Sequence, residues 1–130
     1  MKTTVIYGIV LISLILLGNS FAQHPAVTPK LLSGELIKGV RVIHVTAKRY
    51  QFSPDPIVVN SGERVRFIVT SEDVAHGFSI KDFGINLMLK GPGDTQSIEM
   101  TATKKGSFEI ECSVYCGPGH DRMEAQLVVQ

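Results

Sequence analysis

The sequence has almost no excess of either charge. Its 13 Lys and Arg residues are balanced by 12 Asp and Glu residues, and Lys2 is the one charged residue among the first 22 positions. Without those positions the formal net charge of +1 falls to zero. A domain that binds nucleic acid needs a basic face, so this balance argues against a nucleic-acid partner.

Long apolar runs are missing except at the N-terminus. Residues 1–22 carry Lys2, the apolar run from Val5 to Leu17, and small residues up to Ala22. The run is shorter than the roughly 20 residues that a membrane-spanning helix needs, and the layout is that of a secretory signal peptide. We expect cleavage after Ala22; the alternative is an uncleaved membrane anchor. In both cases the domain is exported, to the periplasm or the outer face of the cytoplasmic membrane.

Cysteine is scarce, and its two occurrences, Cys112 and Cys116, lie far from the N-terminus. A lipid anchor on an N-terminal Cys is therefore excluded. Attachment of a c-type haem uses the pattern C-x-x-C-H, whereas here three residues separate the two Cys and His120 lies four residues beyond Cys116. Two Cys in an exported chain ordinarily suggest one disulfide, which stays open as an alternative.

Helical periodicity and internal repeats are also absent. Residues 23–39 mix Pro and Gly and predict a tether, and the folded domain is expected over residues 40–130. The domain consists of short runs of β type separated by turn residues, and alternation in several of them, such as Val65, Phe67 and Val69, predicts one buried face per strand. The pattern predicts an all-β Greek-key β-sandwich. The expected strands are Arg41 to Ala47, Pro56 to Val59, Arg64 to Thr70, Gly77 to Ile80, Thr95 to Thr101, Ser107 to Cys112 and Ala125 to Val129.

The segment from Cys112 to Met123 gathers unusual side chains. Alternation along the preceding strand places Cys112 on the inward face at the strand's end, after Phe108 and Ile110. The loop that follows contains a second thiol, an imidazole and a thioether, at Cys116, His120 and Met123. Soft sulfur ligands beside imidazole select copper.

A second imidazole is available at His76. It follows the strand Arg64 to Thr70 in the loop from Ser71 to Phe78, and a sandwich brings the loops of one rim together. Gly117-Pro118-Gly119 lets the chain turn sharply before His120.

The motif Asp73-Val74-Ala75-His76-Gly77-Phe78, together with the whole loop from Cys112 to Met123, resembles a known family. This is the copper domain of cytochrome c oxidase subunit II, a cupredoxin-like β-sandwich that carries the dinuclear site called CuA. The resemblance covers roughly residues 40 to 130 and is greatest to the short subunit II chains of B-type haem-copper oxidases.

The resemblance implies a complete set of ligands for two copper ions. Cys112 and Cys116 would bridge both coppers, and His76 and His120 would each bind one of them. Met123 and the backbone carbonyl of Val114 would be the weak ligands. The implied function is one-electron transfer, in which electrons arrive from cytochrome c or another exported donor and pass to haem in the catalytic subunit of a haem-copper oxidase.

The chain departs from the family pattern at two points. Many members have Glu where this chain has Val114, and that Glu also serves a metal at the subunit interface, whereas Val114 offers only its carbonyl. Many members also use aromatic residues including Trp to receive electrons, and this chain has no Trp. Its surface for receiving electrons must therefore differ, or its partner does.

Other interpretations of these residues remain open from the sequence. Besides a Cys112–Cys116 disulfide, they are a tetrahedral zinc site and a single-copper site formed by His76, Cys116, His120 and Met123. Apart from the copper loop, no set of acid, base and nucleophile predicts an enzyme.

The sequence also leaves open a second function, and it predicts where the remaining His and Met residues of the domain lie. A free periplasmic electron carrier or copper-handling protein that works without an oxidase is the alternative function. His44 is expected to point outward from its strand, whereas Met88 and Met100 are expected in the core.

Overall fold

The computed structural model describes residues 31–130. The predicted signal peptide or anchor, residues 1–22, and the first part of the predicted tether lie outside the described residues. Within residues 31–130, no helix has the length and hydropathy that a membrane span requires.

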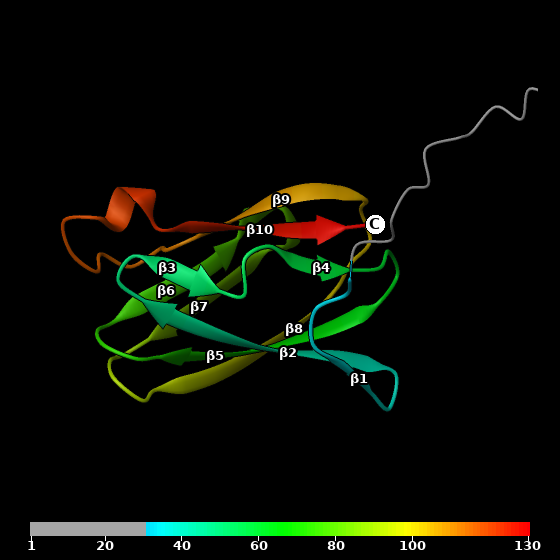
Figure 1. Cartoon of the computed structure of the whole chain (residues 1–130), viewed down its shortest axis with the longest axis horizontal. Helices are drawn as coiled ribbons and strands as arrows, with labels where there is room; N and C mark the ends of the chain where they lie inside the picture. Colours follow the sequence, from blue (N-terminus) through cyan, green and yellow to red (C-terminus); the bar gives the residue numbers. More distant parts are fainter. Residues whose placement is uncertain (1–30) are drawn as a thin grey trace, which may run out of the picture.

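The described chain forms two five-stranded sheets that pack face to face as a β-sandwich (Figure 1). One sheet has the order β1-β2-β5-β8, with β3 also paired to β2, and the other has the order β4-β10-β9-β6-β7. The pairs β2–β5 and β4–β10 are parallel, whereas the other pairs are antiparallel. The strands are β1 (Glu35–Ile37), β2 (Val40–Lys48), β3 (Gln51–Ser53), β4 (Ile57–Val59), β5 (Arg64–Ser71), β6 (His76–Ile80), β7 (Ile85–Leu89), β8 (Thr95–Thr101), β9 (Gly106–Glu111) and β10 (Glu124–Val129).

Period-two alternation produces the core. Val65, Phe67 and Val69 on β5 are buried while the residues between them are partly exposed, and Ala125, Leu127 and Val129 do the same on β10. Aromatic contacts join the sheets: the Phe78 ring of β6 lies 5.3 Å from the Phe67 ring and 5.6 Å from the Phe52 ring, measured between centroids.

The predicted all-β sandwich and the expected strands are confirmed, but the pattern missed three short strands. Of these, β1 lies within the segment expected to be a tether, β3 precedes a Pro-rich turn, and β7 has an apolar sequence without clear alternation. The prediction for Met88 is wrong, because its side chain is 60% exposed. On β7 the buried ends are Ile85 and Leu89, and Met88 points to the opposite face. Met100 is buried and His44 is exposed, as expected.

The ends of the sandwich differ in what they carry. The β5–β6 connection and the long β9–β10 connection lie at one end, shown at the left of Figure 1. The described chain begins at the other end, and the C-terminus also lies there. The residues predicted to bind metal therefore gather at the end remote from residue 31.

A polar network closes the end where the described chain begins. Arg41 on β2 donates two hydrogen bonds to Glu63, of 2.6 and 2.8 Å, and the two side chains are only 7% and 17% exposed. Glu63 also accepts the backbone N–H of Asn60, and Arg41 donates to the carbonyl of Ser33. The hydrogen bonds from Arg41 lower the pKa of Glu63 to about 2, against the opposing effect of burial.

The Arg41–Glu63 pair predicts a pH-dependent stability. The pKa of Glu63 is lower in the folded chain than its ordinary value of 4.5. The pair therefore stabilises the fold fully above pH 4.5, and this stabilisation is lost as the pH falls toward 2. We expect Glu63→Gln to lower the free energy of unfolding at neutral pH by about 1–3 kcal/mol and to flatten its acid dependence, measured by urea denaturation.

The matched control is Glu99→Gln, which removes a carboxylate that pairs with the exposed Arg64 and Arg66 side chains on β5. Its effect should be much smaller, because solvent screens exposed pairs. Equal losses for the two variants would contradict the stabilising role assigned to Glu63.

Candidate metal centre

Two chain segments deliver the candidate ligands. His76 is the first residue of β6 and is fully buried. The other donors belong to the β9–β10 connection, from Cys112 to Met123. That connection is closed at its base, where the Cys112 N–H donates to the Met123 carbonyl at 3.1 Å. The closure brings Cys112 and Met123 to the same place although ten residues lie between them along the chain.

The two thiols lie side by side, and each has its own neighbours. Their sulfur atoms are 3.6 Å apart, and both Cys are free. Cys112 Sγ lies 3.8 Å from His76 Nδ1 and 3.1 Å from the Val114 carbonyl oxygen. Cys116 Sγ lies 3.8 Å from His120 Nδ1 and 3.6 Å from Met123 Sδ. The donors therefore form two sets, each with one thiol, one imidazole and one weak donor.

All six residues predicted from the sequence lie within this arrangement. The donor atoms of His76, Cys112 and Cys116 are the most compact group, within 4.8 Å of one another. His120 approaches from the far side of Cys116 and is half-buried, as is Val114. Both Cys residues and Met123 are buried. The site is thus nearly closed to water, with the His120 side the more accessible.

A hydrogen bond between Asp73 and His76 fixes which nitrogen of the imidazole faces the Cys112 sulfur. His76 Nε2 lies 2.8 Å from an Asp73 carboxylate oxygen. Because a carboxylate only accepts hydrogen bonds, Nε2 carries the proton and Nδ1 presents its lone pair toward Cys112. Burial raises the pKa of Asp73, but hydrogen bonds from the N–H of Arg49, from His76 and from the N–H of Val74 outweigh it and lower this pKa to about 2. The sequence analysis did not identify Asp73 as a functional residue.

The Cys116 thiol is held in its protonated form. Burial, followed by the hydrogen bond and charge of Cys112, raises the pKa of Cys116 to about 11. A thiol with a raised pKa is a poor nucleophile, since the thiolate is the reactive form. Cys116 therefore suits metal binding, in which the ion itself displaces the proton, better than covalent catalysis.

The donor set fits copper. Thiolate, thioether and imidazole are the ligands that copper prefers, and a structural zinc site would use four strong donors in a tetrahedron and leave the Met123 sulfur without a role. A single ion bound as a blue copper would need one thiolate, yet here both thiols have a neighbouring imidazole. The arrangement accommodates a copper pair, with one His on each side.

Two tyrosines flank the loop, and the sequence analysis missed both. Tyr50 packs on Gly117 and Gly119 so closely that a Cβ atom at Gly119 would overlap the Tyr50 ring, and Gly117 has a φ of 133°. These glycines are required by contact and conformation. Tyr115, by contrast, is 72% exposed, and its ring lies 5.6 Å from the His120 ring between centroids.

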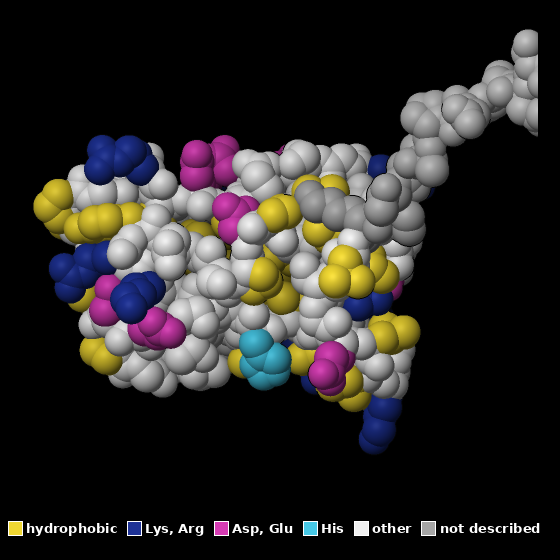
Figure 2. Space-filling model, in the orientation of Figure 1, with side chains coloured by type: hydrophobic (Ala, Val, Ile, Leu, Met, Phe, Trp, Pro, Cys, Tyr) yellow, Lys and Arg dark blue, Asp and Glu magenta, His cyan; other side chains and the backbone are white. Residues whose placement is uncertain are grey.

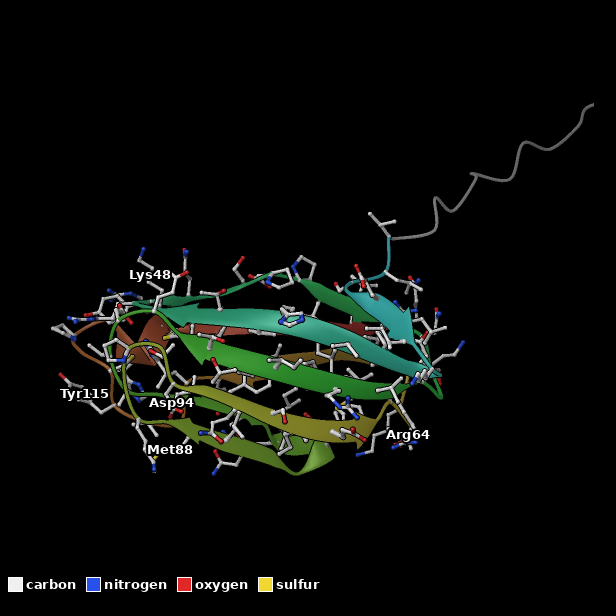
Figure 3. All side chains as sticks on the ribbon, turned by 90° about the horizontal axis from the view of Figure 1, so that it is seen from below. Lys48, Arg64, Met88, Asp94 and Tyr115 are labelled. Carbon is white, nitrogen blue, oxygen red and sulfur yellow. The ribbon has the colours of Figure 1, made fainter. Side chains whose placement is uncertain are left out.

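The end of the molecule that carries the site has a mixed surface. Figure 3 labels Tyr115 and Met88 on this half, together with Lys48 and Asp94. In the space-filling view, basic, acidic and apolar side chains alternate over the same end without a field of one sign (Figure 2). The face that Figure 2 draws therefore offers apolar contact together with charges of both signs.

The sequence model of the family described as "Cytochrome C oxidase subunit II, periplasmic domain" matches residues 37–130. Among individual relatives, two cytochrome c oxidase subunit 2 chains of Thermus thermophilus are each 35% identical to this chain over 88 residues, which is 68% of this chain. The match covers 64% and 52% of these relatives, so this chain spans less than two thirds of their length.

Solved structures have the same fold. A chain of a haem-copper terminal oxidase dimer matches with a TM-score of 0.67 and 29% identity, covering 80% of this chain and 74% of that one. The periplasmic domain of subunit II of cytochrome oxidase from Bradyrhizobium japonicum matches with a TM-score of 0.65 and 24% identity, covering 74% of this chain and 88% of that one. The expected cupredoxin-like sandwich is therefore confirmed.

The Asp73–His76 hydrogen bond predicts that Asp73 strengthens metal binding from outside the ligand set. Asp73→Asn keeps the shape and removes the charge, so His76 keeps at most a neutral amide oxygen in place of the carboxylate that fixes its ring. Replacing such a partner typically weakens metal affinity about 10-fold or more. Competition with a copper chelator measures this change.

The control is Asp94→Asn, because Asp94 also accepts N–H groups, from Lys90 and Gln96, but contacts no candidate ligand. Its copper affinity should equal that of the unmodified chain. The role of Asp73 is refuted by an Asp73→Asn variant that binds copper as tightly as the Asp94→Asn control.

Proposed function

The chain belongs to the family of the cytochrome c oxidase subunit II periplasmic domain, and from this we propose that it transfers single electrons through a dinuclear copper site of the CuA type. In this proposal it is the module through which electrons reach a haem-copper oxidase. The match over residues 37–130 covers strands β2 to β10 and every candidate ligand.

One observation carries the proposal: the duplicated set of donors around two adjacent sulfurs. Cys112 and Cys116 lie 3.6 Å apart, and each thiol has its own imidazole at 3.8 Å. Val114 adds a carbonyl oxygen beside one thiol and Met123 adds a thioether beside the other. A disulfide would use neither imidazole, and a single ion would leave one thiol without a function.

Each residue has a definite task in this proposal. Cys112 and Cys116 would bridge the two coppers, His76 and His120 would each hold one, and Val114 and Met123 would supply the weak donors. One-electron exchange is the chemistry that the bound copper pair supplies. The protein keeps water away by burying both thiols and Met123, and it holds the ligands still through the closure between Cys112 and Met123. Ligands that do not move on electron transfer keep its barrier low.

The location and partners follow from the family. The domain is exported and lies in the periplasm or on the outer face of the membrane, as expected for a subunit II periplasmic domain. We propose the catalytic subunit of a haem-copper oxidase as the electron acceptor and cytochrome c or another exported protein as the donor. We also propose residues 1–22 as signal peptide or anchor, 23–39 as a tether whose last part joins the sandwich as β1, and 40–130 as the copper domain.

The dinuclear site predicts that Cys112 is as necessary as Cys116. Cys112→Ser should lose the absorption and paramagnetic signals of a copper pair and bind at most one copper, because one bridging sulfur is gone. Glu111→Gln, which changes the neighbouring half-buried side chain, should keep both coppers. A single-copper site at Cys116 would instead leave the Cys112→Ser variant with unchanged spectra, and that result would overturn the dinuclear proposal.

Association with an oxidase distinguishes the proposal from the alternative of a free carrier. When the tagged full chain is purified from its own organism in mild detergent, we expect a haem-copper catalytic subunit to accompany it. Haem absorption and mass spectrometry of the purified complex measure this. Recovery of the copper-loaded chain alone, with the oxidase in other fractions, would favour the free carrier or copper-handling protein.

A further inference from the structure

The Val114 carbonyl is a weak candidate donor, so its position depends on the contacts of the surrounding backbone. It belongs to the loop after β9, outside any strand, and its oxygen lies 3.1 Å from Cys112 Sγ. A weak ligand adjusts the reduction potential of a copper site without being needed to hold the metal. The residues that hold this carbonyl in place therefore also influence the reduction potential of the site.

The β6 strand fixes the peptide from one side. Gly77 follows His76 directly, and a Cβ atom at Gly77 would lie 2.6 Å from the Ser113 nitrogen and 2.7 Å from the Val114 nitrogen. Real Cβ atoms essentially never approach so closely. The backbone of β6 thus touches the Ser113–Val114 peptide, and the same strand positions both this peptide and His76.

The β7 strand holds the same peptide through one side chain. The Ser113 hydroxyl donates to the Asn86 side-chain oxygen at 2.8 Å. Asn86 lies opposite Ser79 in the β6–β7 pair, so its position follows from the register of that hairpin. Met88, two residues further along β7, and Tyr115 in the loop lie on the same half of the molecule in Figure 3.

We propose that Asn86 is a positioning residue of the metal centre, which holds the Val114 carbonyl beside the Cys112 sulfur through its hydrogen bond to Ser113. This inference rests on the proposed copper function and assigns a tuning role to the β6–β7 hairpin. Asn86 is exposed and lies 26 residues before Cys112 in the sequence, and the one hydrogen bond that its side chain makes among the described residues is the bond to Ser113. Gly77 allows β6 to touch the Ser113–Val114 peptide, and Asn86 holds that peptide in place through Ser113.

The test compares Asn86→Ala, Ser113→Ala and the double variant in the copper-loaded full chain. Each variant should still bind two coppers, because no strong donor is removed. Each should raise the reduction potential, since a released carbonyl gives less electron density to the oxidised site. The double variant should show the same shift as either single variant, because all three lose one and the same hydrogen bond.

Thr95→Ala is the matched control, because it also removes an exposed hydroxyl hydrogen bond, that between Thr70 and Thr95 on the other sheet. Its potential and spectra should be unchanged. The proposal is overturned if Asn86→Ala or Ser113→Ala behaves like this control, or if their shifts add in the double variant. Failure of the unmodified chain to bind two coppers would overturn the copper function itself, and the copper content distinguishes that case before any variant is compared.

Discussion

The 3.6 Å approach of the Cys112 and Cys116 sulfurs is the constraint on which the rest of the site depends. Two thiols at this distance need a shared cation, a disulfide or protons, and here burial raises the pKa of Cys116 to about 11 and favours the protonated form. The surrounding structure keeps the thiols together without a covalent bond. The hydrogen bond between Cys112 and Met123 closes the base of the loop, and Tyr50 packs against Gly117 and Gly119.

The sandwich and the loop have separate tasks. The sheets supply a rigid rim, in which buried aromatic contacts such as Phe67–Phe78 fix β5 against β6. The rim then places His76, oriented by Asp73, against a loop that carries every other donor. The charged network of Arg41 and Glu63 stabilises the opposite end, where the described chain begins. Changes in stability and changes in the metal centre should therefore be separable.

Sequence reasoning identified the part of the site that is encoded locally. Alternation through Phe108 and Ile110 predicted an inward Cys112, and the structure buries it. The residues that it missed depend on strand pairing or on the conformation of a turn, and the local pattern reveals neither. Asn86 becomes relevant only because β7 pairs with β6, and Asp73 only because the turn before β6 aims its carboxylate at His76. The error at Met88 has the same origin, because a short apolar run does not reveal which face is buried.

The central claim is that this chain binds a pair of coppers that share one unpaired electron. The most direct measurement is the copper content of the reconstituted protein together with its electron paramagnetic resonance spectrum. The account predicts two coppers per chain and a mixed-valence signal whose hyperfine pattern comes from two equivalent copper nuclei. One copper per chain, with a hyperfine pattern from a single nucleus, would contradict it.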